Sequence, residues 1–140
     1  MKINKFYIAG KFITPDGDEI IDLINPATEE KVGHVVSGSI KDVNDAVNAA
    51  KQAFQAASVL SLEQKKTILQ EIIDGMDERR EEFAQLISEE MGAPIKVARG
   101  AQFSSGKVHF VNTLKVIDGF SFSEVHDNIT LNKLPIGPVG

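Results

Sequence analysis

The apolar residues of this chain change their spacing at Ser39, and this switch constrains the fold more than any other feature. Before it, four short runs rich in apolar residues are separated by turn-forming residues, a pattern typical of strands. These runs are Phe6–Ile8, Lys11–Ile13, Glu19–Ile24 and Val32–Val36. After Ser39, apolar residues recur every three or four positions, which is typical of helices that bury one face. The sequence therefore predicts an α/β chain in which short strands precede helices.

Three turns separate the predicted strands. Ala9 and Gly10 form a two-residue connection, in which Gly can adopt positive φ, so the first two runs are expected to form a hairpin. In the stretch from Pro15 to Asp18, Pro presets φ, and we expect Gly17 to take the left-handed conformation. Asn25 and the proline after it close the third strand.

Two capping boxes predict where the first helices begin. Ser39 with Asp42, and Ser61 with Gln64, place a hydroxyl and a second side chain where each can bond a free N–H of the first helical turn. The first helix carries a repeating set of apolar residues, namely Val43, Ala46, Val47, Ala50, Phe54 and Ala57. The second carries Ile68, Leu69, Ile72, Ile73 and Met76.

Two further helices follow. Gly75 weakens the end of the second helix by about 1 kcal/mol relative to Ala, so we expect a break near Asp77. Gly92 is suited to end the third helix, and Pro94 to the first turn of a fourth that runs to about Ile117. The third helix presents Phe83, Leu86, Ile87 and Met91, and the fourth is expected to bury Phe110, Val111 and Leu114.

The last part of the chain is apolar. Ile129–Leu134 predicts a strand with Ile129 and Leu131 on one face, and Leu134–Gly140 is rich in Gly and Pro. Domains normally end in exposed polar segments. We therefore expect a chain that continues into a core it does not complete, with helix faces that need cover from further polypeptide. A frayed apolar tail is the alternative.

Charge and hydropathy exclude several classes of protein. The net charge of −5 argues against nucleic-acid binding, which needs clustered Lys and Arg. The stretch from Ser61 to Met91 holds nine acidic and four basic residues, and so accounts for this whole charge, as a solvated helix face would. No apolar run approaches the ~18 residues of a membrane span, and the first residues do not resemble a signal peptide. We expect a soluble cytoplasmic protein with no membrane partner.

The residues alone indicate no reaction. The chain contains no Cys, which excludes a thiol nucleophile or a disulfide within it. His34, His109 and His126 lack the spacing of metal ligands, and no Gly-rich phosphate loop or nucleophile elbow is present. Composition and spacing therefore give a soluble α/β or α+β domain of unknown activity.

Five segments, taken in order, resemble the aldehyde dehydrogenases. They are Phe6–Phe12, Asn25–Thr28, Asp42–Phe54, Glu90–Pro94 and Leu134–Gly137. Ala9, Ala93 and Pro138 depart from the Asn, Lys and Val that are usual in the family. The resemblance covers roughly residues 6–140, and it implies that the chain is the N-terminal portion of such an enzyme.

That resemblance implies an activity which these residues do not themselves carry. In the family, a Cys thiolate attacks the aldehyde, an Asn and a backbone N–H stabilise the oxyanion, hydride passes to NAD or NADP, and a Glu activates water to release the carboxylic acid. The matching segments lie beyond residue 140. We therefore assign no catalytic and no cofactor-binding residue here, and expect this truncated fragment to be inactive alone.

The resemblance also implies a division of the chain. Residues 1–122 would form the N-terminal part of the cofactor-binding domain, with strands over 6–36 and helices over about 40–117, and residues 123–140 would begin the oligomerisation segment. The catalytic domain would be absent. Ile129, Leu131 and Leu134 would contribute to the interface of a homodimer or homotetramer, and the aldehyde would bind to the missing part.

One binding site is implied within the chain. Many family members hold a monovalent cation, Na⁺ or K⁺, between a backbone carbonyl near the Asn-Pro turn and an acid at the helix end, and the matching positions are Ile24 and Glu90. Glu89 and Glu90 lie at a helix C-terminus, where the helix dipole disfavours carboxylates by ~0.3–1 kcal/mol unless a cation offsets them. Two solvated acids are the alternative.

Two other functions stay open. The chain could be a stand-alone, non-catalytic helical interaction module, in which case it would melt cooperatively as a monodisperse species. It could also belong to an NADP-linked semialdehyde or betaine-aldehyde dehydrogenase of the same fold, because the residues that select aldehyde and cofactor lie elsewhere.

Overall fold

Five short strands precede the first helix in the computed structural model, which describes residues 2–140. They are β1 (Lys2–Ile3), β2 (Phe6–Ile8), β3 (Lys11–Ile13), β4 (Ile20–Ile24) and β5 (Lys31–Val36). β2 and β3 form an antiparallel hairpin, whereas β5 lies between β1, which is parallel to it, and β4, which is antiparallel. The four predicted strands are confirmed within one residue. β1 was not predicted, because a two-residue strand has no periodicity to read.

The hairpin turn confirms its prediction with one addition. Both Ala9 (φ 51°) and Gly10 (φ 77°) adopt the left-handed conformation, and Ile8 pairs directly with Lys11 across the turn. Two positive φ values in a two-residue connection are the signature of a type I′ turn, whose twist matches that of the strands. Ala9 therefore occupies a position that favours Gly or Asn.

Both capping boxes form as predicted. Helix α1 (Ile40–Ser58) begins after Ser39, whose Oγ accepts the N–H of Asp42 at 3.3 Å. Helix α2 (Leu62–Glu78) begins after Ser61, whose Oγ accepts the N–H of Gln64 at 3.2 Å while its own N–H donates to Gln64 Oε1 at 2.9 Å. These local bonds satisfy N–H groups that have no partner inside the helix.

The predicted break after α2 is a single residue. Helix α3 (Arg80–Met91) begins directly after Arg79, and it ends at Gly92, whose φ of 67° is left-handed. The fourth predicted helix is also present, as α4 (Ile95–Val97), one π-helical turn η1 (Ala98–Gln102) and α5 (Phe103–Ile117) in direct succession. The irregular stretch contains Gly100, one of the two glycines in the middle of this predicted helix.

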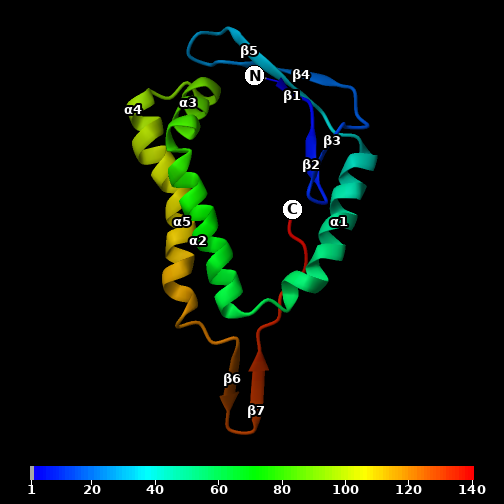
Figure 1. Ribbon diagram of the computed structural model, residues 1–140, viewed down its shortest axis with the longest axis vertical. Helices are drawn as coiled ribbons and strands as arrows, with labels where there is room; N and C mark the ends of the chain where they lie inside the picture. Colours follow the sequence, from blue (N-terminus) through cyan, green and yellow to red (C-terminus); the bar gives the residue numbers. More distant parts are fainter. Residues whose placement is uncertain (1) are drawn as a thin grey trace.

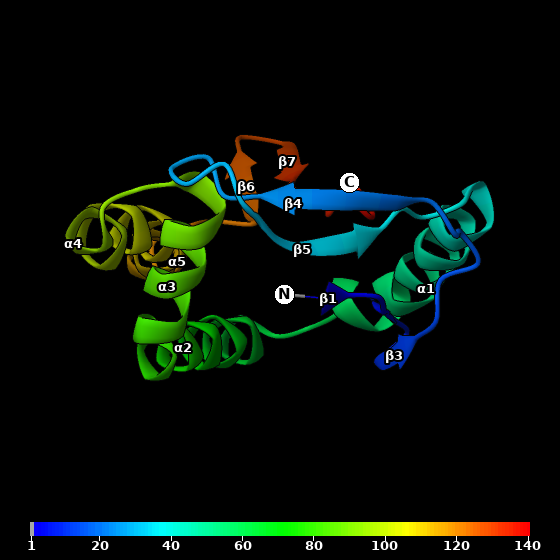
Figure 2. The ribbon, with the colours of Figure 1, turned by 90° about the horizontal axis from the view of Figure 1, so that it is seen from above.

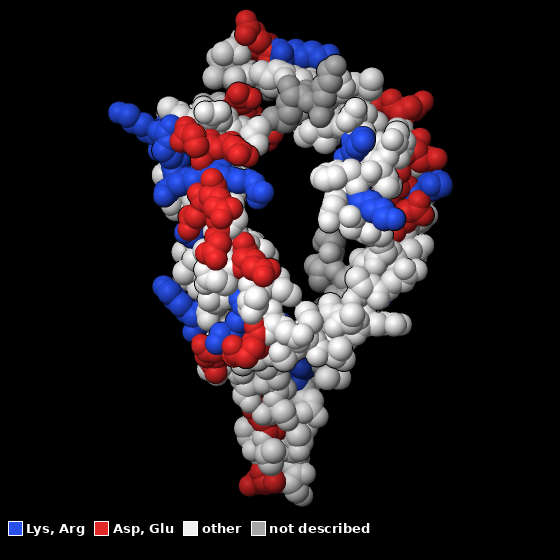
Figure 3. All heavy atoms as spheres, viewed as in Figure 1, with Lys and Arg blue, Asp and Glu red and all other residues white. Residues whose placement is uncertain are grey.

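The strands and helices surround an opening. Figure 1 shows α1 on one side, α2 and α5 together on the other, and β4 and β5 at one end. From above, β4 and β5 lie across the space between α1 and the remaining helices (Figure 2). The space-filling view shows that side chains do not close this opening, and that acidic side chains gather along the arm containing α2 and α3 (Figure 3).

The small core lies between α2, α3 and the fourth helix. The buried apolar residues among those described are Ile73, Ala84, Ala98 and Phe103, and the rings of Phe83 and Phe103 lie 5.9 Å apart. Ion pairs of Lys107 with Asp77 and of Lys66 with Asp118 join α2 to α5 and its C-terminus. The residues expected to be buried on the fourth helix, Phe110, Val111 and Leu114, are only half-buried.

Many apolar side chains of the helix faces stay exposed. Ile72 on α2 is 38% exposed and Leu86 on α3 is 42% exposed, although both belong to the predicted apolar faces. Large exposed apolar patches on soluble proteins mark contact surfaces, whereas single exposed apolar side chains are common. The helices of the described residues therefore carry exposed apolar side chains, as expected, and their cover by further polypeptide stays a prediction.

The second turn differs from its prediction. Gly17 does not adopt positive φ, so the left-handed conformation predicted for it is wrong. A Cβ at Gly17 would instead lie 2.2 Å from the carbonyl oxygen of Ser37. Glycine is required here because two backbone segments approach closely, which the local sequence does not reveal.

A hairpin follows the helices. β6 (Ser123–His126) pairs antiparallel with β7 (Ile129–Asn132), with Asp127 at φ 54° in the turn, and the hairpin projects from the end of the molecule opposite β4 and β5 (Figure 1). The strand predicted from Ile129 begins where expected and ends two residues early, at Asn132 rather than Leu134. β6 was not predicted, because its sequence Ser-Glu-Val-His has one apolar residue.

Candidate functional site

The turn between β4 and β5 lies against the end of α3. A Cβ added to Gly92 would lie 3.0 Å from Cγ of Pro26 and 3.2 Å from the backbone nitrogen of Ala27. The absence of a side chain at Gly92 therefore allows this turn to approach the helix end. The sequence predicted that Gly92 would end the helix. It did not predict this contact, because the two segments are distant along the chain.

Asn25 fixes the shape of the turn. Its Oδ1 accepts the N–H of Ala27 at 2.8 Å, and its own N–H donates to the carbonyl of Glu30 at 2.9 Å. Its carbonyl in turn accepts the N–H of Glu29, which has a φ of 61°. An Asn side chain that bonds the backbone two residues ahead is a stable turn former. The turn is therefore held by its own bonds where it meets α3.

Ile24 and Glu90, the two residues predicted to hold a cation, line one cavity. This cavity has a volume of about 390 Å³, and its other walls are the aliphatic side chains of Ile3, Leu23, Val32 and Val35. The strand register shifts between Leu23 and Ile24, which is the irregularity of a β-bulge. A bulge at the end of a strand changes the direction of the backbone groups that follow it.

The electrostatics of this cavity come from one carboxylate. Glu90 belongs to the last turn of α3, where no basic residue is present, and Glu89 beside it does not line the cavity. Within residues 2–140, no group of three His, Cys, Asp or Glu residues gathers in a way that could hold a metal ion. The cavity lining therefore includes one carboxylate, and carboxylate oxygens are ligands that hard cations prefer.

Leu23, Val32 and Val35 were not predicted as part of this site. Alternate residues of a strand point to the same side, so the pattern of β4 and β5 could have grouped some of them. The bulge prevents a simple reading of that alternation, because it displaces the register beyond Leu23.

The predicted interface residues lie elsewhere. Ile129 and Leu131 belong to β7 and Leu134 to the segment after it, whereas Ile24 ends β4. β7 lies at the opposite end of the molecule from β4 (Figure 1). All three are exposed, as is Val125 of β6. The hairpin therefore presents apolar side chains to its surroundings.

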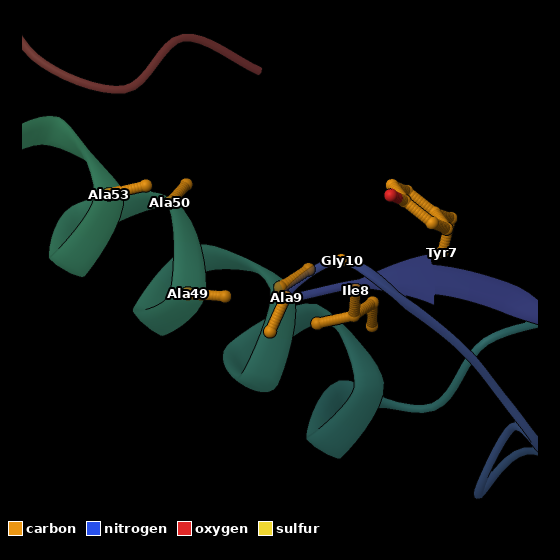
Figure 4. A pocket seen from close by; sticks show the side chains of 8 residues that line it. Tyr7, Ile8, Ala9, Gly10, Ala49, Ala50 and Ala53 are labelled. Carbon is orange, nitrogen blue, oxygen red and sulfur yellow. The ribbon is translucent and has the colours of Figure 1, made fainter. Parts of the chain in front are cut away.

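A second cavity lies between the β2–β3 hairpin and α1. It has a volume of about 310 Å³, and Figure 4 shows Ala49, Ala50 and Ala53 of α1 on one side and the turn at Ala9 and Gly10 on the other. Its only polar side chain is the Tyr7 hydroxyl. General acid–base catalysis depends on positioned titratable side chains, and the other residues that line this cavity are Ile, Ala and Gly. This cavity offers packing surface instead.

Comparison with known proteins assigns the chain to a family. The model of the aldehyde dehydrogenase family matches residues 12–140. The chain belongs to the aldehyde dehydrogenase family. This confirms the resemblance that the five ordered segments carried.

Solved structures of aldehyde dehydrogenases share both its sequence and its fold. An aldehyde dehydrogenase from Bartonella henselae is 35% identical with a TM-score of 0.87, and covers 91% of this chain and 27% of its own. A variant of aldehyde dehydrogenase C from Pseudomonas syringae, in complex with NAD⁺ and octanal, is 39% identical with a TM-score of 0.89, and covers 92% of this chain and 27% of its own. The predicted α/β fold class, with short strands followed by four helices, is confirmed.

The chain spans little more than a quarter of its relatives. A protein of Staphylococcus haemolyticus, named provisionally as an aldehyde dehydrogenase, is 33% identical over 134 residues, which are 96% of this chain and 28% of that protein. Among residues 2–140 of this family member, no helix is both long enough and apolar enough to span a membrane.

Proposed function

We propose that this chain is the N-terminal segment of an enzyme that oxidises aldehydes to carboxylic acids with NAD or NADP. Membership of the aldehyde dehydrogenase family supports the reaction class, and the likeness to the P. syringae chain is the single observation that carries it, because that chain was crystallised with NAD⁺ and octanal. In this proposal, NAD(P) accepts hydride and a Cys outside these residues attacks the aldehyde.

The role that we propose for these residues is to support the rest of the enzyme. The chain contains no Cys, and in its described part no group of three or more His, Cys, Asp or Glu residues could hold a metal ion. Its helices instead carry exposed apolar side chains, including Ile72 and Leu86. An opening separates α1 from the other helices (Figure 3). Further polypeptide that covers these faces would remove apolar area from water, at about 25 cal/mol per Å².

The reaction is tested with two proteins. The 140-residue chain, and the same chain extended to the full length of its relatives, are incubated with octanal and either NAD⁺ or NADP⁺, and reduced cofactor is followed at its ultraviolet absorbance. We expect turnover only with the extended protein. The matched control is the extended protein with Ala in place of the Cys that attacks the aldehyde. Turnover by the 140 residues, or its absence from the folded extended protein with every aldehyde tried, would contradict the proposal.

The same pair of proteins distinguishes the alternative function. A stand-alone interaction module would be monodisperse and melt in one sharp transition without further polypeptide. We expect the 140 residues to associate or to melt broadly, because their exposed apolar faces are contact surfaces. Light scattering and circular dichroism on both proteins separate the two functions.

A further inference from the structure

A cavity of about 420 Å³ opens at the junction of three segments. These are the end of α1 with the start of α2, the residues between α5 and β6, and the residues that follow β7. Its lining combines aromatic rings and ammonium groups, and includes Ser58, Lys65, Phe120, Phe122, Lys133 and Leu134. No acidic side chain lines it.

Both lysines lie over aromatic rings that line the cavity. Phe120 and Phe122 meet edge to face with ring centroids 4.8 Å apart. Lys65 Nζ lies 5.0 Å from the centroid of Phe122, and Lys133 Nζ lies 4.7 Å from that of Phe120. Both distances are within the range of cation–π attraction, so the rings fix where the two charges lie.

The two lysines differ in their partners. Lys133 donates to the carbonyl of Ser121 at 3.0 Å and forms an ion pair with Glu124, so its charge is already compensated. Lys65 makes no ion pair and no side-chain hydrogen bond to any residue from 2 to 140, although it is half-buried. An ammonium group has three donors. Lys65 therefore has donors to offer at the edge of the cavity.

The position of Lys65 in α2 adds a second argument. Its N–H makes the first hydrogen bond of the helix, to the carbonyl of Ser61, so it lies near the positive end of the helix dipole, where a cation is disfavoured. The neighbouring Lys66 is compensated by Glu63 and Asp118, at 3.3 and 2.8 Å. Lys65 lacks this compensation, and an anion beside it would supply it.

We propose that this cavity binds an organic monocarboxylate with an aliphatic tail. The carboxylate would accept hydrogen bonds from Lys65, and the tail would lie against Phe122, Phe120 and Leu134. A small inorganic anion would use the charge and leave the apolar wall exposed, whereas an amine would bring a like charge toward both lysines. The proposal rests on this cavity alone and does not depend on the proposed oxidation, because binding is measured without turnover.

The experiment uses the protein purified at its natural chain length, with octanoate as the probe. Isothermal titration calorimetry compares octanoate with acetate and octylammonium. We expect octanoate to bind, acetate to bind at least about tenfold more weakly because it lacks the tail, and octylammonium not to bind. The affinity for octanoate should fall as salt is added, because Lys65 is not deeply buried.

Two variants test the contacts. Lys65→Met keeps the aliphatic stem and removes the charge, and should weaken octanoate binding by about tenfold. Lys115→Met removes an equal charge from an exposed position that does not line the cavity, and should leave binding unchanged. Because Lys65 is disfavoured by the helix dipole, its replacement should not unfold α2, and a circular dichroism melt checks this.

Several results would overturn the proposal. These are no octanoate binding at millimolar concentration, equal binding by Lys65→Met and the unchanged protein, or equal binding of octanoate and octylammonium. A crystal structure of the natural-length protein in which a polypeptide segment fills the cavity and pairs with Lys65 would overturn it as well. In that case the site would be a contact within the protein.

Discussion

The carboxylate of Asp42 accepts the backbone N–H of Asp16, 26 residues earlier, at 2.9 Å from Oδ1. The same carboxylate accepts the N–H of Gly17 at 3.1 Å and that of Ser39 at 2.8 Å, and the side chain is only 4% exposed. One residue therefore caps α1 and fastens the segment before β4 to the helix start. These bonds, that from Asp16 first, lower the pKa of Asp42 to about 2 from its ordinary value of 3.8.

Asp42→Asn should destabilise the natural-length protein and change its response to acid. Because the pKa is lower in the folded state, the stabilisation by Asp42 is complete above about pH 4 and is lost as the pH falls toward about 2. The unchanged protein should therefore lose free energy of unfolding over this range, and Asp42→Asn should lose less of it. Urea unfolding followed by circular dichroism at several pH values measures both effects.

The matched control is Asp45→Asn on the same helix. Among the described residues, Asp45 pairs only with Lys41, at 3.0 Å on an exposed surface, and such pairs contribute little. An equal loss of stability in the two variants would show that the bonds to residues 16 and 17 do not stabilise the fold.

Gly92→Ala should destabilise the protein for two reasons. The φ of 67° costs a residue with a Cβ about 1–2 kcal/mol, and that Cβ would lie 3.0 Å from Cγ of Pro26. Gly100→Ala is the control, because Gly100 lies in the η1 turn with nothing within 4 Å of an added Cβ. We expect the control to be neutral or to stabilise by up to about 1 kcal/mol. Chemical unfolding of both variants measures the difference, and equal effects would contradict it.

Ala9→Asn should stabilise the β2–β3 hairpin. Ala9 has a φ of 51°, which Asn tolerates better than Ala, so we expect a gain of about 1 kcal/mol in the free energy of unfolding. Ala9→Val should have the opposite effect, because a β-branched residue is strained at positive φ. Thermal melts of the two variants should move in opposite directions, and a shift in the same direction would show that the turn does not determine the effect.

Leu131→Lys should weaken self-association of the natural-length protein. Leu131 and Ile129 are exposed on β7, where we propose that copies of the enzyme meet, and a charge there would have to lose its water when the copies associate. Thr130→Lys is the control, because adjacent residues of a strand point to opposite faces. Light scattering should report a smaller oligomer for Leu131→Lys alone. The same oligomer in both variants would place the interface elsewhere.

Local signals account for what the sequence predicted correctly. Ser39 and Ser61 each bond a backbone group three residues ahead, and the left-handed Gly92 ends a helix, so a short window of sequence contains the cause and the effect. Ala9 and Gly10 likewise act within their own hairpin. These positions account for the starts of α1 and α2, the end of α3 and the turn between β2 and β3.

Contacts between distant segments account for the features that the sequence did not predict. The close approach of Gly17 to Ser37 and the bond between Asp16 and Asp42 depend on how the chain returns on itself. Phe110 is less buried than expected for a related reason. The spacing of apolar residues identifies the apolar face of a helix, but not whether polypeptide is present to cover that face. The candidate site was placed by the family resemblance, while its aliphatic walls became visible only in the fold.

Glu90 provides the last prediction, which concerns a monovalent cation. We propose that Na⁺ or K⁺ binds between the Glu90 carboxylate and the Ile24 carbonyl, because both residues line one cavity and no base follows Glu90 in the last turn of α3. An ion that binds only the folded state raises the free energy of unfolding by about 1.4 kcal/mol at ten times its Kd. The protein should therefore melt at a higher temperature in NaCl or KCl than in choline chloride of equal ionic strength.

Glu90→Gln should remove this difference between salts, whereas Glu89→Gln should keep it. Both variants delete one negative charge from the same helix end, so general screening and relief of the helix dipole affect them alike. Only Glu90 lines the cavity, so only its replacement removes a ligand. If the melting temperature depends on the salt equally in both variants, or if a crystal grown in K⁺ shows only water beside Glu90 and Ile24, the two glutamates are solvated acids and the aliphatic walls enclose no ion.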